Sequence, residues 1–197
     1  MDYADEKLDK RETILNAAQQ VFAEKGYYNA KVETIAEQAS IAKGTVYLYF
    51  ASKQELLTAL IENRMKRMHT LITKLACEHR DFMSLLKDII RAHFIFYQNE
   101  QDFVKLLYGQ LGQVASEMEG AAKRSYDTLQ KMVAAILARG IDEGVLCKMD
   151  INTMCQSLEG MINAVAFDWV ISNRDTTPKA LADDVFALFC NGAVIKG

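Results

Sequence analysis

Residues 32–50 read VETIAEQASIAKGTVYLYF, and this stretch decides the fold. Two groups of apolar residues repeat here at the spacing of a helical face: Val32, Ile35, Ala36 and Ala39, then Val46 and Phe50. Only Ser40, Ile41 and Ala42 separate the two groups. Because a connection this short forces two helices to cross steeply, the pattern predicts a helix-turn-helix with Ile41 packed between them.

The second helix of this pair has an outward face that a purely structural helix does not need. Lys43 and Gly44 stand at its N-terminus, where the helix dipole favours phosphate and a glycine lets DNA approach the backbone. Thr45, Tyr47 and Tyr49 offer hydroxyl groups to phosphates or base edges, and the tyrosine rings suit thymine methyl groups. The structural alternative is a helical hairpin with core aromatics, since motif matches include false positives.

The same residues carry a family resemblance. The matching residues are Ile35-Ala36, Lys43-Gly44-Thr45, Tyr47, Tyr49-Phe50, Ser52-Lys53 and Glu55-Leu56-Leu57. Over about residues 11–60 the chain resembles the tetracycline-repressor (TetR/AcrR) family of bacterial transcription regulators. The resemblance implies a homodimer on near-palindromic operator DNA, most often a repressor, released by a small ligand.

Three positions depart from the family pattern. Ser40 stands where glycine is usual in the turn, Ala42 where serine is usual, and Ala30-Lys31 where serine or threonine is usual. We therefore expect weak N-caps on both helices of the motif. The resemblance implies that Lys31 supplies a phosphate contact by charge. Together with the outward face, the predicted DNA-binding residues are Lys31, Thr34, Lys43, Gly44, Thr45, Tyr47, Tyr49 and Lys53.

The chain as a whole reads as an all-α protein. It has 197 residues, 50% of them hydrophobic, with one proline and no Asn-Gly or Asp-Gly hairpin signal. We expect about nine helices: a helix-turn-helix domain over residues 1–51 and a helical ligand-binding and dimerisation domain over residues 52–197. The N-terminus is unlike a signal peptide and no apolar run is long enough to span a membrane, so a cytoplasmic location is expected.

Helix boundaries are predicted from runs of apolar residues at helical spacing and from capping residues. Outside the motif, four helices are predicted over residues 9–25, 81–97, 103–111 and 116–139. A long helix is predicted from the capping box Ser52-Lys53-Gln54-Glu55 to Leu75. Two more are predicted at the end of the chain: one capped by Asp150 that runs through Trp169, and a last one that begins at Thr177-Pro178. Gly140 is expected to close the helix before it. We expect a two-fold dimer through residues 153–171 and 179–193, because those helices have more apolar surface than one neighbour covers.

Composition and motifs weigh against other classes. The net charge is −3, which gives no global support to DNA binding, although residues 25–53 hold four lysines against two glutamates. The four cysteines are scattered and are expected to be reduced core residues, and Cys77 with His79 lacks the second ligand pair of a metal site. No phosphate loop or catalytic motif occurs, so we expect neither an enzyme nor a cofactor.

The effector is predicted from side chains that the resemblance places round a central pocket. These residues are Phe94, Tyr97, Phe103, Leu107, Tyr108, Leu111, Met161, Val165 and Trp169. An apolar and aromatic lining selects a largely apolar ligand, either a fatty acyl compound or a hydrophobic aromatic. Arg91 or His93 is a candidate partner for a carboxylate or phosphate head group. The alternative function is a helical sensor or scaffold that has lost DNA binding, which the altered caps and acidic charge favour.

Overall fold

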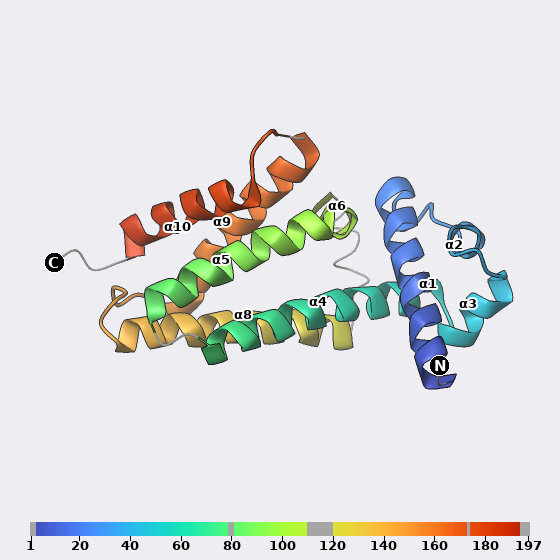
Figure 1. Ribbon diagram of the computed structural model, residues 1–197, viewed down its shortest axis with the longest axis horizontal. Helices are drawn as coiled ribbons and strands as arrows, with labels where there is room; N and C mark the ends of the chain where they lie inside the picture. Colours follow the sequence, from blue (N-terminus) through green and yellow to red (C-terminus); the bar gives the residue numbers. More distant parts are fainter. Residues whose placement is uncertain (1–2, 79–80, 110–119, 173, 194–197) are drawn as a thin grey trace. The chain divides into compact units, whose positions relative to one another are not determined.

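The computed structural model describes residues 3–78, 81–109, 120–172 and 174–193 (Figure 1). Nine helices lie within these ranges, and the predicted all-α class is confirmed. Their bounds are α1 Tyr3–Lys25, α2 Val32–Gln38, α3 Lys43–Tyr49, α4 Lys53–Glu78, α5 Phe82–Asn99, α6 Gln101–Gly109, α8 Ala121–Asp142, α9 Ile151–Ser172 and α10 Pro178–Ala193. None of the described helices is long and apolar enough to cross a membrane.

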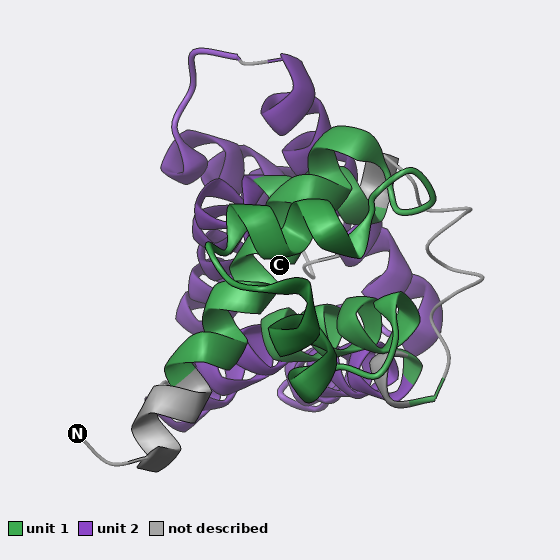
Figure 2. Ribbon diagram, turned by 90° about the vertical axis from the view of Figure 1, so that its right-hand side faces the viewer, with its two compact units in different colours: residues 1–64, 102–123 green, residues 65–101, 124–197 purple. Residues whose placement is uncertain are grey.

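The chain forms two compact units, which Figure 2 shows in different colours. The first contains residues 1–64 and 102–123, and the second contains residues 65–101 and 124–197. The division therefore falls inside α4, between Arg64 and Met65. The boundary expected after residue 51 lies where α4 begins, and the first three turns of α4 belong to the first unit.

The core of the first unit is built where α1 packs on α2 and α2 packs on α3. The apolar stripe predicted for α1 is buried, and Ile35, Val46 and Phe50 of the helix-turn-helix are at most 2% exposed. Helix α4 begins at the predicted capping box: the Ser52 hydroxyl accepts the Glu55 N–H at 3.0 Å. The Glu55 carboxylate accepts the Ala51 N–H at 2.6 Å, which satisfies a second free donor at the helix start.

The second unit is organised by α5, α9 and α10, which pack against one another in all three pairs. In Figure 1, α10 runs along α5. Each of these helices begins at a side-chain cap: Asp81 accepts the Ser84 N–H at 2.7 Å, Asp150 accepts the Thr153 N–H at 2.7 Å, and Thr177 accepts the Ala180 N–H at 3.2 Å. The predicted starts of these helices are confirmed, because each cap satisfies a donor that the helix leaves free.

Gly140 does not close α8, contrary to the prediction, since the helix continues to Asp142. A Cβ built at Gly140 would lie 2.4 Å from the ring of Phe82, so the glycine gives this aromatic side chain room. The turn after the helix uses Gly144, whose φ of 70° is in the left-handed region that glycine tolerates.

The cysteines were predicted to be core residues, and this is wrong for one of them. Cys77 is exposed near the end of α4, whereas Cys155 is buried and Cys147 and Cys190 are partly buried. All four are free thiols. The apolar stripe of α4 misled the prediction, because Cys77 follows the last turn that the stripe covers.

Candidate nucleic-acid interface and effector-binding region

The turn between α2 and α3 is closed by two backbone hydrogen bonds. The Ile41 N–H donates to the Ala36 carbonyl and the Ser40 N–H donates to the Glu37 carbonyl, both at 3.0 Å. This is the Schellman arrangement, which places one residue in the left-handed region. That residue is Ser40, with φ of 55°. The turn therefore has the backbone for which a glycine is best suited, and Ser40 adopts it at some cost in strain. Ile41 is only partly buried beside it.

Both helices of the motif lack a side-chain N-cap, as the departures from the family pattern predicted. The residue before α2 is Lys31 and the residue before α3 is Ala42, and neither accepts a cap hydrogen bond through its side chain. The packing of Val32, Ile35 and Val46 into the core must hold these short helices in place.

Helix α3 presents a broad surface to solvent. Lys43 and Gly44 are exposed, Tyr47 is 44% exposed, and Thr45 and Tyr49 are partly buried. Thr34 on α2 is also partly buried, and Lys31 is exposed. The structure thus brings most of the predicted DNA-binding residues onto the two helices of one motif.

Sequence reasoning missed Leu48, whose side chain is 82% exposed in the middle of α3. A leucine so placed does not stabilise the first unit by burial, and its methyl groups suit a thymine methyl in a major groove. The signal was present in the sequence. Leu48 lies two residues from both Val46 and Phe50, which puts it opposite their buried face.

Gly44 has no role in the fold that requires glycine. A Cβ at this position would meet no atom within 4 Å, and its φ lies outside the left-handed region. Glycine in a helix costs about 0.5–1 kcal/mol relative to alanine. The open space above Gly44 leaves room for another molecule to approach the backbone closely.

Lys43 is paired with an acidic side chain of the same motif. Its ammonium group donates to the Glu33 carboxylate and lies 5.8 Å from the centre of the Tyr47 ring. The hydrogen bond from Lys43 lowers the pKa of Glu33, and Glu33 in turn raises the pKa of Lys43. Both groups are exposed, so a phosphate would compete with Glu33 for Lys43 at little cost in desolvation.

Lys53, predicted to contact a phosphate, makes hydrogen bonds inside the first unit. Its ammonium group donates to the backbone carbonyls of Tyr27, Tyr28 and Ala30, at 2.8, 3.2 and 3.1 Å. It also lies 4.7 Å from the centre of the Tyr27 ring. Since an ammonium group has three donors, all of them are used inside the protein. Lys53 therefore ties the loop before α2 to the start of α4, and its phosphate contact stays a prediction.

A second tie joins α4 to α1 at Arg64, which is 1% exposed. Its guanidinium group donates to three polar side chains on one face of α1: Glu12 at 2.8 Å, Asn16 at 2.6 Å and Gln19 at 2.7 Å. A fourth bond goes to Asn63 at 2.7 Å. A buried charge with this many acceptors is fully compensated, so the pair of helices is fixed in one register.

In the second unit, several predicted effector-binding residues lie on facing helices. Phe94 and Tyr97 of α5 are buried, as is Trp169 of α9. The Tyr97 hydroxyl donates to the Asn163 side chain at 2.8 Å, which joins α5 to α9. Met161 and Val165 are partly buried on α9.

The remaining predicted effector-binding residues belong to the first unit or lie outside the residues that the structure describes. Phe103 and Leu107 of α6 are buried in the first unit. The side chain of Tyr108 and all of Leu111 lie outside the described residues.

The head-group candidates occupy different environments. His93 is buried, and its Nδ1 lies 2.8 Å from the Ile89 carbonyl. Burial lowers the pKa of His93, which favours the neutral ring with Nδ1 donating. A neutral ring is a poor partner for a carboxylate. Arg91 lies at the surface, where it donates to Asp183 of α10 at 2.9 Å.

A polar cluster between α8 and α9 was also missed from the sequence. Gln130 donates to the Glu159 carboxylate, and the Cys155 thiol lies 3.8 Å from the same carboxylate. Burial raises the pKa of Glu159 to about 7 and that of Cys155 to about 12. The cluster lies beside a cavity of about 90 Å³. Gln130 and Glu159 are 29 positions apart, so no local sequence pattern indicated the cluster.

Comparison with known proteins identifies the family. The profile of bacterial regulatory proteins of the tetR family matches residues 14–60. The profile of the tetracyclin repressor-like C-terminal domain matches residues 80–193, which is more than half of the chain. The chain belongs to the TetR family. It is a DNA-binding transcriptional regulator with a ligand-binding C-terminal region, as the resemblance of residues 11–60 implied.

Relatives of this TetR-family chain align over nearly its whole length. It is 27% identical to the fatty acid metabolism regulator protein of Bacillus subtilis over 95% of this chain and 97% of that protein. It is 31% identical to the HTH-type transcriptional regulator YvdT of the same organism over 76% of this chain and 79% of that protein.

Solved structures show the same fold. The fatty acid degradation regulator FadR from Bacillus halodurans superposes with a TM-score of 0.83 at 27% identity, covering 93% of this chain and 95% of that one. FadR from Bacillus subtilis in complex with stearoyl-CoA has a TM-score of 0.80 at 25% identity, covering 92% and 98%. Both solved structures are of transcriptional or metabolic regulators.

Proposed function

We propose that the chain is a dimeric repressor that binds a near-palindromic operator and is released by a fatty acyl effector, with an acyl-CoA as the preferred form. The observation that carries the DNA-binding part is the solvent-exposed face of α3. It combines an exposed leucine, an exposed tyrosine and a glycine that the fold does not need: Leu48, Tyr47 and Gly44.

Within this proposal, base readout and phosphate contact fall to different residues. Leu48, Tyr47 and Thr45 contact base edges and thymine methyl groups, and Lys43 and Lys31 contact phosphates. Lys43 exchanges its Glu33 partner for a phosphate on binding. Glu33→Gln is therefore expected to raise operator affinity, since it removes both a competitor for Lys43 and a negative charge near DNA.

The test is operator binding, measured by mobility shift and footprinting on the gene's own upstream region. Lys43→Gln should weaken binding to all sequences and lower the salt slope by about 1, whereas Leu48→Ala should also relax specificity. Lys66→Gln is the matched control, because Lys66 is exposed on α4 outside the helix-turn-helix. Unchanged affinity in Lys43→Gln, Tyr47→Ala and Leu48→Ala together would overturn the assignment of the α3 face, whereas a wild type that binds no upstream DNA would favour the alternative of a sensor that has lost DNA binding.

We place the dimer interface on α9 and α10. The exposed stripe of α9 consists mostly of residues with small or apolar side chains, Thr153, Ser157, Gly160, Ala164 and Ile171, and its one charged member, Asp168, is paired with Arg174. A Cβ at Gly160 would meet nothing within 4 Å, so the glycine is not needed inside the subunit. On α10, Leu188 is 65% exposed. Small residues let a second pair of helices approach closely, and Leu188 supplies apolar area.

Sedimentation tests this interface. Leu188→Glu should convert a dimer into monomers at micromolar concentration and abolish tight operator binding, because two recognition helices are needed for two half-sites. Met149→Glu is the control, since Met149 is 50% exposed but lies outside α9 and α10. Dimers that persist in Leu188→Glu and Gly160→Leu would remove this face from the proposal.

The effector class is supported by the aromatic and apolar residues buried along α5 and α9, and by relatives named for fatty acid metabolism, one of them bound to stearoyl-CoA. An effector that fits only one conformation shifts the population away from DNA. The usual coupling range of about 1–3 kcal/mol is enough to release an operator. Oleoyl-CoA should therefore dissociate the operator complex, whereas coenzyme A alone and a metal ion should not.

A further inference from the structure

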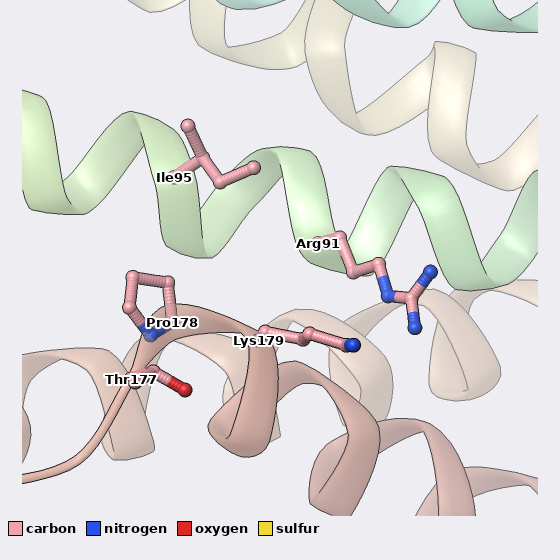
Figure 3. Close-up of a pocket in the computed structure, with 5 residues that line it drawn as sticks. All are labelled: Arg91, Ile95, Thr177, Pro178 and Lys179. Carbon is pink, nitrogen blue, oxygen red and sulfur yellow. The ribbon is translucent and has the colours of Figure 1, made fainter.

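A surface pocket in the second unit lies where α5 passes the start of α10, with a volume of about 320 Å³. Its lining residues are Arg91 and Ile95 from α5 and Thr177, Pro178 and Lys179 from the start of α10. Figure 3 shows Ile95 facing Pro178 at one end, and the amine of Lys179 on the same side as the guanidinium group of Arg91. This volume is at the lower limit of ligand pockets, so it suits part of a ligand.

One end of the pocket is apolar, and packing within the chain does not require this apolar side chain to be exposed. Ile95 is 50% exposed, although its neighbours Phe94, Phe96 and Tyr97 are all buried. A single exposed isoleucine is ordinary on a protein surface. Here, however, its side chain and the Pro178 ring form the two sides of one hollow, which favours a ligand with an apolar portion.

The other end has an excess of positive charge. Asp183 accepts from Arg91 at 2.9 Å and lies 3.4 Å from Lys87, and Asp88 lies 3.6 Å from Arg91. These pairs hold the Arg91 guanidinium group in place. Lys179 has no acidic partner in the described part of the chain, and the lining holds two cations, Arg91 and Lys179, and no carboxylate.

One donor in this cluster is also unused. The Arg91 Nε is buried and has no hydrogen-bond partner among the described residues. Burying a polar group without a partner is costly, and such groups call for an explanation. A fixed guanidinium group beside a free ammonium group forms a preorganised arrangement for an anion, since little side-chain freedom remains to be lost on binding.

We propose that this pocket binds a phosphate group of an amphiphilic ligand, with Lys179 and Arg91 on the phosphate and with Ile95 and Pro178 against the neighbouring apolar part. The assignment rests on the proposed function where the ligand is an acyl-CoA, whose coenzyme A portion carries the phosphates. A separate phosphorylated metabolite has the same chemistry, and the two sources give different results below.

The experiment uses the full-length chain and three probes: oleoyl-CoA, coenzyme A and oleate. Binding is measured by calorimetry, and Lys179→Gln is the main variant because Lys179 is exposed and unpaired among the described residues. Lys148→Gln is the matched control, since Lys148 is an exposed lysine outside the pocket. A second variant, Ile95→Glu, places a carboxylate in the apolar end.

Lys179→Gln should weaken oleoyl-CoA binding roughly ten- to a hundredfold, the loss typical of a hydrogen bond to a charged group. Ile95→Glu should weaken it further, and Lys148→Gln should leave it unchanged. Oleate binding should be the same in all four proteins, because oleate has no phosphate. The loss in Lys179→Gln should shrink at high salt.

The other outcomes overturn the pocket assignment, the acyl effector, or both. If oleoyl-CoA binds the wild type and both pocket variants equally, the pocket assignment is wrong and the acyl effector stands. If oleoyl-CoA fails to release the operator but coenzyme A binds the wild type and not Lys179→Gln, the pocket is an independent phosphate site and the acyl effector is wrong. If the wild type binds neither thioester nor coenzyme A, both are overturned.

Discussion

Replacing Arg64 by leucine tests how α4 is held to the DNA-binding unit. The change removes donors from Glu12, Asn16, Gln19 and Asn63, at distances between 2.6 and 2.8 Å. It also leaves the Glu12 carboxylate without its buried cation. Breaking one side of a buried ion pair costs about 3–5 kcal/mol. We expect the free energy of unfolding of the first unit to fall by about this amount.

The chain supplies a matched control one turn further along α4. Arg67 pairs with Glu100 at 2.8 Å, but its side chain is 46% exposed. Exposed pairs contribute about 0–1 kcal/mol, so Arg67→Leu should cost far less than Arg64→Leu. The two substitutions remove the same charge and the same side chain from the same helix, and differ in burial and partners.

Urea titration followed by circular dichroism measures both variants. The single tryptophan, Trp169, belongs to the second unit, so its emission reports that unit separately. Arg64→Leu should lower the dichroism midpoint and separate it from the Trp169 midpoint. The reasoning fails if Arg64→Leu and Arg67→Leu lose the same stability, or if Arg64→Leu costs less than about 1 kcal/mol.

Four further changes have expected outcomes. Ser40→Gly should stabilise the chain by about 0.5–1 kcal/mol in urea titration, because it relieves the left-handed backbone of the turn at φ of 55°. Gly44→Ala should raise stability by about 0.5 kcal/mol through helix propensity yet weaken operator binding in a mobility shift. If Gly44→Ala lost both stability and operator affinity, or lost neither, the role given to Gly44 would be contradicted. The folded-state pKa of Glu159 is raised to about 7, so stability should fall as pH rises from about 4.5 to 7, and Glu159→Gln should remove on the order of 1–2 kcal/mol of this fall. The pKa of His93 is lowered, so stability should fall as pH drops below about 6.5, and His93→Gln should remove that opposite dependence in pH-resolved unfolding.

The sequence was sufficient wherever the deciding signal was local. The helix-turn-helix follows from apolar spacing and a three-residue connection. The starts of α4, α5, α9 and α10 follow from caps within three residues of the donors that they satisfy. Even the unfavourable features could be predicted locally, since Lys31 and Ala42 cannot accept a cap bond and do not.

Predictions were wrong where the deciding partner is distant in sequence. Gly140 was taken as a helix stop because nothing nearby shows that the Phe82 ring lies against it. The hydrogen bonds of Lys53 to the loop before α2 were not foreseen, because its three carbonyl acceptors are 23 to 26 residues upstream. Leu48 was passed over for the opposite reason. Its exposure is a local consequence of helix geometry, but an apolar residue is assumed to face inward unless its angle is checked.

Two cations of α4, Lys53 and Arg64, fix this helix to the DNA-binding unit. Lys53 holds the loop before α2, and Arg64 holds one face of α1. The two residues are eleven apart in one helix, about 16 Å along its axis. Two ties at that separation resist rotation as well as sliding, so the helix-turn-helix and the first three turns of α4 behave as one rigid body. Under the proposed function, we expect that an effector which displaces α4 beyond Arg64 carries α3 with it, without a further conformational change inside the DNA-binding unit.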